Sequence, residues 1–387
     1  MSSLRKTALH TFHRQVLSAS TMAEFAGYDM PIQYKGLGIL KESLATRSSA
    51  GFFDVSHMGQ ARVRGKDRRK FVEKVLVGDP FALPMNKCSL SLVLTPEAGI
   101  LDDVIFSTHP DHINIVLNAG NKHLDFKHFL EVKKQFFAKD DVELEFVEGE
   151  SLLAIQGPRA AALLQPFFKQ DLTKIGFSSF FTEKVDALDG HVTAYRTGYT
   201  GEDGFELALS DRSALILAEK LFEGYVPGAE GPGGLFPAGL GARDALRLEA
   251  GLCLHGHEIS TQTSPIEALL MWTVRKRDTE VSFIGAERLS ELKKSPPGVK
   301  RTGITMVEGG ICREGMRVSD ESGQELGTLT SGTFSPVLKK GIGMIYLPNH
   351  LRQKGTKVVV DVRGRKGIAE VVDKLPFVPA KYYKLDK

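Results

Sequence analysis

Two adjacent aspartates, Asp102 and Asp103, lie inside an apolar segment with the composition of a β-strand. Successive strand residues face opposite sides of a sheet, so one of the two carboxylates is expected to point inward. Burial disfavours the charged form of a carboxylate, and active sites use this effect to obtain a proton acceptor near neutral pH. An edge strand with both aspartates solvated is the open alternative.

A second candidate lies in the glycine-rich segment 196–209. Its glycines, Gly198, Gly201 and Gly204, are three residues apart and favour turns. The alternation that follows predicts a half-buried strand, with Glu206 on the face opposite to Phe205. On spacing alone, a tight hairpin with a solvated glutamate is the favoured interpretation.

Glu206 gains interest together with Arg243, which lies in a helix predicted over residues 238–250 and is four residues before Arg247. A carboxylate accepts two parallel N–H bonds, which is the donor pattern on the edge of a 2-amino-4-oxo pyrimidine. A guanidinium recognises oxygens in the same planar way. The two residues could therefore hold a pterin or a similar ring, or they could form a structural salt bridge.

Several other chemistries have no support in the sequence. Neither a phosphate-binding loop nor a dinucleotide fingerprint is present, and no serine nucleophile elbow occurs. His255 and His257 flank a glycine, but a lone histidine pair is weak evidence for a metal, so no metal is expected. The cysteines Cys88, Cys253 and Cys312 are too far apart for a zinc motif and indicate reduced thiols.

Composition predicts an ordinary globular protein. The 387 residues suggest two or three domains, with 42% hydrophobic and 25% charged residues. A net charge of +3 is too small to indicate a nucleic-acid partner, and no apolar run approaches the roughly 18 residues of a membrane span. We expect neither nucleic-acid nor membrane binding.

The order of predicted elements favours an α+β fold. Strand patterns at residues 51–63, 89–95, 100–106 and 113–117 precede a long helical segment, and strands and helices alternate irregularly up to residue 250. From about Gly285, frequent glycines separate short β-rich segments, which predicts a separate all-β sandwich or barrel.

Seven short motifs occur together and in order, from about Leu4 to Leu385. With them, the chain resembles the aminomethyltransferase family, the T-proteins of the glycine cleavage system. Each motif is weak alone, but the ordered set is specific: Phe53–Met58, Gly99–Asp103, Asn118–Gly120, Leu153–Pro158, Gly198–Glu206, Gly239–Gly251 and Thr330–Pro336.

The resemblance implies a three-domain cloverleaf around a central folate funnel. Residues 1–50 with 141–226, and 51–140 with 227–284, would form two discontinuous α+β domains, and 285–387 a β-barrel of jelly-roll type. The implied reaction moves the methylene of S-aminomethyl-dihydrolipoyl H-protein to tetrahydrofolate. It gives 5,10-methylenetetrahydrofolate, ammonia and dihydrolipoyl H-protein, and it requires lipoylated H-protein as partner and no metal.

The resemblance also implies roles for individual residues. Asp103 matches the carboxylate at the reacting folate nitrogen, and Arg301 matches an arginine that supports the architecture. The remaining matches are the substrate-binding residues Glu206, Arg243 and Tyr382 and the folate-pocket residues Met58, Leu90, Val116, Asn118, Phe177, Tyr199 and Trp272.

Two features depart from the family pattern. A single glycine, Gly99, precedes the Ile-Leu-Asp-Asp motif where two are common, and the glycine-rich segment 228–235 is longer than usual. Either could shift the geometry of the site. The Lys/Arg clusters Arg64–Lys70 and Arg275–Arg277 are candidates for contacts with the anionic folate tail.

Related folds offer two alternatives. The folate-binding half of sarcosine or dimethylglycine dehydrogenase would follow a flavin domain, for which we expect no room upstream. A non-catalytic folate-binding protein that assists iron–sulfur assembly would carry a Lys-Gly-Cys signature, whereas the chain has Gly251–Glu258 without that lysine. The likeness to mitochondrial family members favours the mitochondrial matrix. The first 23 residues have the basic composition of a transit peptide, but no long presequence is expected, which leaves the cytoplasm as the alternative.

Overall fold

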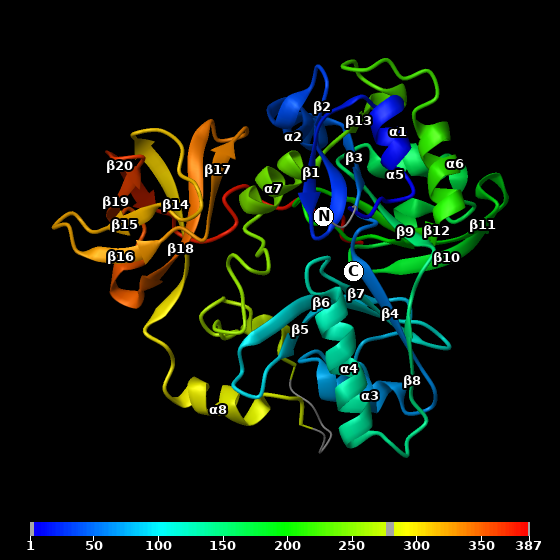
Figure 1. Cartoon of the computed structure of the whole chain (residues 1–387), viewed down its shortest axis with the longest axis horizontal. Helices are drawn as coiled ribbons and strands as arrows, with labels where there is room; N and C mark the ends of the chain where they lie inside the picture. The colour runs from blue at the N-terminus through cyan, green and yellow to red at the C-terminus, as the bar shows by residue number, and fades with distance from the viewer. Residues whose placement is uncertain (1–3, 276–281, 386–387) are drawn as a thin grey trace.

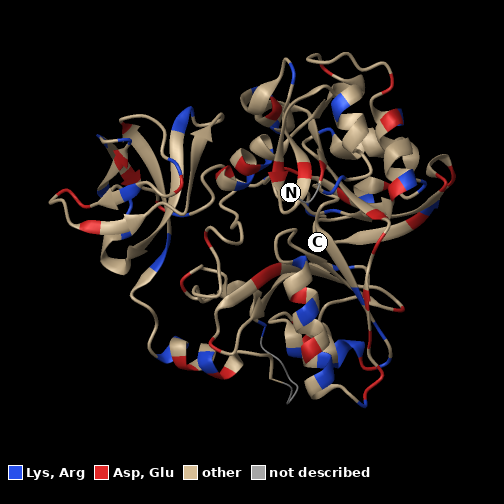
Figure 2. Cartoon of the chain, viewed as in Figure 1, with Lys and Arg blue, Asp and Glu red and all other residues tan. Residues whose placement is uncertain are grey.

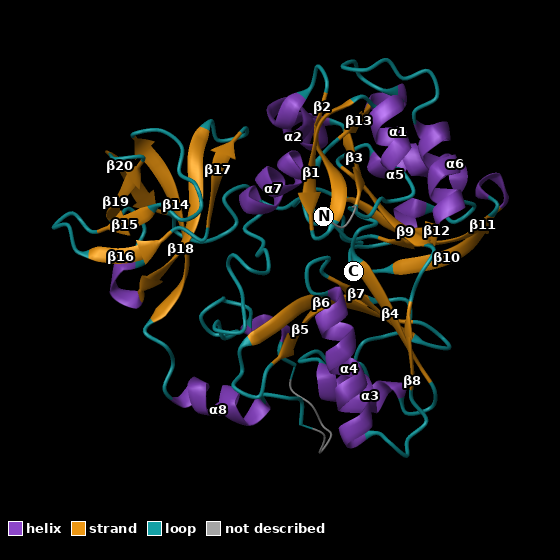
Figure 3. Cartoon of the chain, in the orientation of Figure 1, coloured by secondary structure: helices purple, strands orange, loops and turns teal. Residues whose placement is uncertain are grey.

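The computed structural model describes residues 4–275 and 282–385, in which three groups of strands and helices surround a central region (Figure 1). Two groups combine sheets with helices, and the third is built from strands, as Figure 3 shows by colour. The predicted α+β class with a separate β-rich C-terminal part is therefore confirmed. None of the helices in these two ranges is long and apolar enough to cross a membrane.

The first group is a six-stranded sheet in the order β10-β11-β12-β9-β3-β13. One face packs on helices that enclose a core with Phe52, Ile155 and Phe205. The strands are β3 (Ala50–Asp54), β9 (Glu150–Gln156), β10 (Phe180–Val185), β11 (Gly190–Tyr195), β12 (Gly204–Ser210) and β13 (Leu235–Pro237), and the helices are α1 (His10–Gln15), α5 (Ala160–Leu164) and α6 (Asp211–Leu221).

The opposite face of this sheet meets the amphipathic helix α7 (Leu240–Glu249). Ala242 and Leu246 of α7 pack with Phe53 of β3 and Ala154 of β9. Helix α7 also contacts α2 (Gly38–Ser48) and the hairpin formed by β1 (Ala19–Phe25) and β2 (Tyr28–Tyr34). This packing carries Arg243 and Arg247 to the centre of the molecule, where all three groups meet (Figure 1).

The second group is a five-stranded antiparallel sheet in the order β5-β6-β7-β4-β8. Phe71, Phe129 and Phe106 belong to the core between this sheet and its two helices. The strands are β4 (Gly59–Arg64), β5 (Cys88–Leu94), β6 (Ile100–Thr108), β7 (Ile113–Leu117) and β8 (Glu143–Phe146), and the helices are α3 (Arg68–Val75) and α4 (Lys122–Phe136).

The third group is a curled antiparallel sheet of seven strands, reached through α8 (Ala286–Lys294). Its hydrogen-bonded order is β16-β15-β19-β20-β14-β18-β17, so the ladder starts at β16 and ends at β17. The strands are β14 (Val299–Glu308), β15 (Arg317–Ser319), β16 (Glu325–Thr328), β17 (Ser331–Ser335), β18 (Lys340–Pro348), β19 (Lys357–Val362) and β20 (Arg365–Val371). Single 3₁₀ turns lie at η1 (Gln165–Phe167), η2 (Leu172–Lys174), η3 (Asp186–Leu188), η4 (Pro232–Gly234), η5 (Met271–Thr273) and η6 (Asn349–Leu351).

The strand pairing bears on the predicted domain boundaries. β3 and β13, which the sequence interpretation placed in the second domain, pair in the six-stranded sheet, while β8 joins the five-stranded sheet. The boundaries at residues 50, 140 and 226 remain a prediction. We propose that the first domain also includes β3 and β13 and that the second includes β8, because a shared ladder of hydrogen bonds couples its strands into one folding unit.

Candidate functional site

A single cavity of about 1330 Å³ lies where the three groups meet. This volume exceeds the roughly 300–1,000 Å³ of a typical small-molecule pocket, so a ligand and a reacting group could enter together. All the residues named by the resemblance border this cavity: Met58, Leu90, Asp103, Val116, Asn118, Phe177, Tyr199, Glu206, Arg243, Trp272, Arg301 and Tyr382.

Asp102 and Asp103 face opposite sides of β6, as the strand alternation predicts. Asp102 is fully buried, and Asp103 is half-buried on the wall of the cavity. The solvated alternative is therefore wrong for this pair. Figure 2 shows them as an acidic band on β6 at the centre of the molecule. Burial, and then the charge of Asp102, raise the pKa of Asp103 to about 7.

Asn118, directly after β7, holds the two aspartates in register. Its Nδ2 donates to Oδ1 of Asp103 at 2.8 Å and to Oδ1 of Asp102 at 2.9 Å, and its backbone N–H donates to Oδ2 of Asp102 at 3.2 Å. These bonds fix one carboxylate oxygen of Asp103. The second oxygen of Asp103 can therefore contact a ligand in the cavity.

The turn that presents Asp103 is closed despite the missing second glycine. The backbone N–H of Thr95 donates to Gly99 O at 2.9 Å, and the N–H of Gly99 donates to Oγ1 of Thr95 at 3.2 Å. Ala98, in the position before Gly99, adopts a left-handed φ of 63°. The alanine thus takes a conformation that glycine adopts without strain.

Glu206 reaches the cavity from β12 at the end of the glycine-rich loop. Its neighbours Phe205 and Leu207 belong to the helix-covered core on the other face, so the predicted facing is confirmed. Oε2 of Glu206 accepts a hydrogen bond from Oγ1 of Thr197 at 2.8 Å. The half-buried carboxylate is thereby oriented, and it retains acceptor capacity for a ligand.

The loop itself is held by the fully buried Gln156 of β9. Its Nε2 donates to Thr197 O at 3.0 Å, and its Oε1 accepts from Oγ1 of Thr200 at 3.0 Å. Gly198 passes so close that a Cβ there would lie 1.7 Å from Oε1 of Gln156. A glycine is required at this point because the loop backbone touches the amide of Gln156.

Arg243 and Glu206 form no ion pair within 4.0 Å, so the salt-bridge alternative is wrong for these two described residues. Nη1 of Arg243 is buried without a hydrogen-bond partner, and the guanidinium stacks on the Tyr199 ring at 4.8 Å. Burial lowers the pKa of Arg243, and the charge of Glu206 opposes this effect. A buried donor without a partner is costly, which favours a ligand that accepts from it.

Two aromatic rings from distant parts of the chain stack beside the cavity. Phe177 and Tyr382 lie with ring centroids 4.0 Å apart and an interplanar angle of 16°. The neighbouring Tyr383 covers the Arg196 guanidinium at 3.9 Å, and its hydroxyl donates to Thr173 O at 2.9 Å. These contacts fix the C-terminal segment against the first group of elements.

Two arginines anchor the floor of the cavity. Arg301 donates from Nη1 to Gly251 O at 2.7 Å and from Nε to Ala268 O at 3.0 Å. Arg247, which the sequence only placed on one face with Arg243, forms a buried ion pair with Glu258 at 2.7 Å and bonds Oγ of Ser331. Both guanidinium groups therefore tie the 251–270 segment to the C-terminal sheet.

Two histidines, His57 and His255, lie in the cavity wall. The sequence analysis did not single out His57, and it considered His255 only as a weak candidate for a metal ligand. His57 is buried with no partner for Nδ1, and burial lowers its pKa to about 4, so its ring is neutral. Nδ1 of His255 lies 3.0 Å from Nδ2 of Asn121, which makes that nitrogen the acceptor. His57 stands in the Phe53–Met58 motif, which was the available signal.

No group of three or more metal-ligating side chains occurs in the described part of the chain. Cys88 and Cys253 border the cavity and Cys312 lies in the C-terminal core. Burial raises the pKa of Cys88 and Cys253 to about 12, which keeps these two thiols protonated and unreactive.

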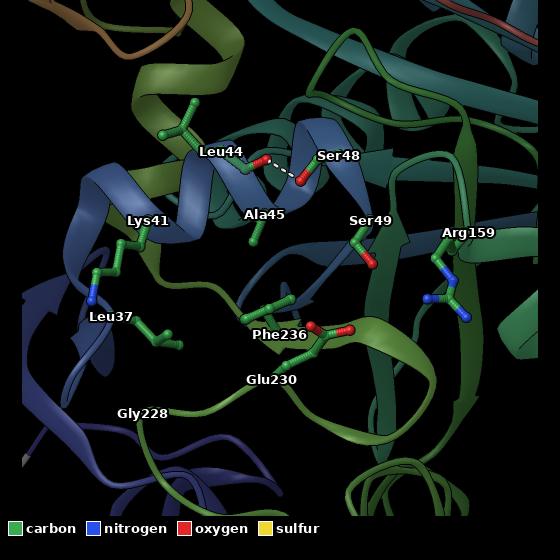
Figure 4. A pocket seen from close by; sticks show the side chains of 10 residues that line it. All are labelled: Leu37, Lys41, Leu44, Ala45, Ser48, Ser49, Arg159, Gly228, Glu230 and Phe236. Atoms are coloured by element: carbon green, nitrogen blue, oxygen red, sulfur yellow. Dashed lines mark hydrogen bonds between the residues drawn. The ribbon is translucent and has the colours of Figure 1, made fainter.

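A second, shallower pocket of about 570 Å³ lies at the surface between α2 and residues 228–236 (Figure 4). Leu37, Leu44 and Phe236 supply its apolar lining, with Lys41 and Arg159 at its rim. It shares no residue with the central cavity, so the longer 228–235 segment forms this outer wall and leaves the central cavity unobstructed.

The two basic clusters predicted to contact the folate tail, Arg64–Lys70 and Arg275–Arg277, lie in different surroundings in the structure. Arg64 pairs with Asp111 and Glu145, and Lys70 pairs with Asp67, so these members of the first cluster are engaged in structural contacts. Arg275 borders the cavity, whereas residues 276 and 277 lie outside the described residues. Contact with a folate tail stays a prediction.

Comparison with known proteins accounts for nearly the whole chain. Residues 10–278 match the GCVT N-terminal domain and residues 300–378 match the glycine cleavage T-protein C-terminal barrel domain. The chain belongs to the glycine cleavage T-protein family. The resemblance stated from sequence motifs is therefore confirmed.

Similar proteins bear the same description. Mitochondrial aminomethyltransferase of Dictyostelium discoideum is 42% identical over 389 residues, covering 99% of this chain and 94% of that protein. The Pisum sativum protein of that name is 40% identical, with 99% and 91% covered. The crystal structure of glycine cleavage system aminomethyltransferase T from Bartonella henselae matches with a TM-score of 0.88 and 36% identity, covering 99% and 100% of the two chains. T-protein family membership makes this chain an enzyme of glycine cleavage.

Proposed function

We propose that this protein transfers the methylene group of S-aminomethyl-dihydrolipoyl H-protein to tetrahydrofolate. The products are 5,10-methylenetetrahydrofolate, ammonia and dihydrolipoyl H-protein. The observation that carries the proposal is the meeting of Asp103, Glu206 and Arg243 in one cavity of a T-protein family chain. The similarity to aminomethyltransferases supports this function over a non-catalytic folate-binding role in iron–sulfur assembly.

Tetrahydrofolate is assigned to the central cavity as co-substrate. Glu206 would accept the two parallel N–H bonds from the amino-pyrimidine edge of the pterin, and Arg243 would donate to an oxygen or nitrogen acceptor of the ligand. The stacked Phe177 and Tyr382 offer an aromatic wall for the conjugated part of the molecule. Met58, Leu90, Val116, Tyr199 and Trp272 would complete the pocket.

Asp103 would orient folate N5 and accept or share its proton. Attack on the sulfur-bound methylene requires N5 in a fixed position and its proton removed. A carboxylate with a pKa near 7 is a stronger acceptor than a solvated aspartate and is still ionised above neutral pH. The tethered lipoyl arm would bring the carbon at high effective concentration. Arg301 would support the floor beneath this site through its bonds to Gly251 and Ala268.

The test is an assay of methylenetetrahydrofolate formation with aminomethyl-loaded H-protein. We expect turnover by the native protein and a loss of at least about a hundredfold in Asp103→Asn, the lower end of the range for general acid–base catalysis. Folate binding by the same variant, measured by calorimetry, should persist. Near-normal turnover of Asp103→Asn would contradict the role of Asp103, and an intact folate complex without transfer in the native protein would favour the binding-protein alternative.

We propose the mitochondrial matrix as the location, because the similar proteins are named mitochondrial aminomethyltransferases. Fractionation of cells with an antibody to the native protein tests this assignment. Recovery in the cytosolic fraction would contradict it.

A further inference from the structure

Asp125, in the first turn of α4, lies buried behind the Asp102–Asp103 pair and is not part of the cavity wall. Its exposed fraction is 0%, the same as that of Asp102. Its backbone N–H donates to Asn121 O at 2.9 Å, so this residue is fixed in the helix. The sequence analysis did not single it out.

The carboxyl group of Asp125 contacts the side chain of Asp102 within hydrogen-bonding reach. Among the described residues, no donor reaches either Asp125 oxygen. Two ionised carboxylates cannot remain together in a buried site without a cation, because desolvation and like-charge repulsion both disfavour the second charge. The contact is favourable only if one of the two groups carries a proton.

Cations and donors around the pair are already engaged elsewhere. Asp102 accepts from the backbone N–H of Asn118 and from the amides of Asn118 and Asn121, which stabilise it as the anion. Lys122, one turn earlier in α4, donates to His57 O at 2.8 Å and to the Tyr28 hydroxyl at 3.0 Å. The proton therefore belongs to Asp125.

Charged groups on the packed elements leave this assignment unchanged. On β4, Arg62 pairs with Glu145 of β8 and with Glu150. Arg64 of the same strand pairs with Asp111 and also with Glu145. His128 of α4 is a neutral neighbour, because burial lowers its pKa. Lys70 of α3 pairs with Asp67 at 2.9 Å. The groups that act on the Asp125 carboxyl are Asp102 and Asp103.

We propose that Asp125 and Asp102 share one proton at neutral pH, so that Asp125 is a buried acid that positions the Asp102–Asn118–Asp103 chain. Asp125 donates to Asp102, Asp102 holds Asn118, and Asn118 holds one oxygen of Asp103. The pair also keeps a single negative charge beside Asp103, which favours protonation of Asp103. Asp125 is a positioning residue, and this role rests on the proposed function of Asp103.

Protonation itself can be tested without any activity assay. Burial and the charge of Asp102 raise the pKa of Asp125 to about 10, whereas Asp103 and Glu42 have values of about 7. At a pH between these values, infrared spectra of the full chain should show the carbonyl band of a protonated acid. The band should persist in Asp103→Asn and disappear in Asp125→Asn. A native spectrum without the band, or a band that survives in Asp125→Asn, would overturn the proposal.

The positioning role predicts a change in pH dependence that a purely structural role would not cause. In Asp125→Val the shared proton is lost, while the donors from Asn118 and Asn121 still hold Asp102 as the anion. The unshielded charge of Asp102 then raises the pKa of Asp103 further. The acid limb of kcat/KM should therefore move to higher pH by roughly one unit. Asp125→Asn keeps an N–H donor and should keep the limb in place. Equal pH profiles in the two variants would refute the positioning role of Asp125. The infrared spectra would still report the protonation of Asp125, and the transferase assay would still test the role of Asp103.

Discussion

Asp103 combines a fixed orientation with an unusual proton affinity, and both come from neighbouring side chains. Asn118 fixes one of its oxygens, while burial and the Asp102 charge favour its protonated form. Asn118 also reduces this effect, since its hydrogen bond stabilises the ionised carboxylate. The balance leaves a group that changes protonation state close to physiological pH.

We expect kcat/KM to fall as the pH is lowered through about 7. Below that value Asp103 is protonated and can no longer accept a proton from folate, so the rate should fall about tenfold per pH unit. Steady-state kinetics with saturating H-protein would check this profile. A rate that stays constant down to pH values near those of ordinary carboxylates would contradict the assignment.

Glu206 gives a second prediction at this scale. Removal of its carboxylate in Glu206→Ala should weaken folate binding by about 1.5–3 kcal/mol, which corresponds to roughly 10–100-fold, because hydrogen bonds to a charged group are lost. Glu206→Gln keeps the size and one acceptor oxygen, so it should lose less. Calorimetric titration of both variants measures the difference in folate affinity. Unchanged affinity in Glu206→Ala would mean that Glu206 only accepts the hydrogen bond from Thr197 and does not bind folate.

At the scale of single elements, the glycine-rich loop depends on close contact with β9. Gly198→Ala would place a Cβ 1.7 Å from Oε1 of Gln156, whose amide bonds hold Thr197 and Thr200. We expect a loss of about 1–3 kcal/mol in the free energy of unfolding, as for other overpacked sites. Weaker folate binding should accompany it, since Tyr199 and Glu206 flank the same loop. Denaturant unfolding and calorimetry measure the two effects.

Gly298→Ala is the matched control for this variant. A Cβ at Gly298 meets no atom within 4 Å, so its stability should change by less than about 0.5 kcal/mol. Equal stability of Gly198→Ala and Gly298→Ala would show that the loop tolerates the shift and that Gln156 does not hold it.

Alternation along single strands was enough to predict how the site residues face. Glu206 occupies the cavity side of β12 because its neighbours Phe205 and Leu207 are apolar and buried. Asp103 occupies the cavity side of β6 because its neighbours Asp102 and Val104 are buried on the opposite face. Tertiary contacts were beyond the reach of such local patterns. Asp125 is an ordinary helical aspartate in the sequence, and only the docking of α4 on its sheet brings it against Asp102. The stacking of Phe177 on Tyr382 likewise depends on the path of the whole chain.

At the scale of the whole molecule, a largely buried network joins five segments. Arg47 of α2 pairs with Glu202 of the glycine-rich loop at 3.1 Å and with Glu249 of α7 at 2.8 Å. Glu249 also accepts from Oγ of Ser335 in β17, and Lys381 of the C-terminal segment pairs with Glu202. One guanidinium thus connects elements from all parts of the chain except the five-stranded sheet.

Arg47→Ala should lower the free energy of unfolding by about 3–5 kcal/mol, because it removes the buried cation that Glu202 and Glu249 share. Glu202 then keeps only the exposed Lys381 as a cation, and Glu249 keeps only neutral donors. Arg212→Ala is the matched control, since Arg212 pairs with Asp189 at 3.2 Å but is exposed, and such pairs contribute about 0–1 kcal/mol. Denaturant or thermal unfolding of the two variants measures the contrast. Similar losses in both would mean that the network adds nothing beyond a surface ion pair.

The central position of β3 also has a consequence during protein synthesis. This strand is buried along its whole length and pairs with β9, about a hundred residues later, and with β13, later still. At a translation rate of about 5–20 residues per second, Phe52 and Phe53 remain without partners for several seconds after they leave the ribosome. During that interval the newly made chain exposes an apolar β-strand, so a ribosome-associated chaperone that shields this segment should increase the yield of folded protein.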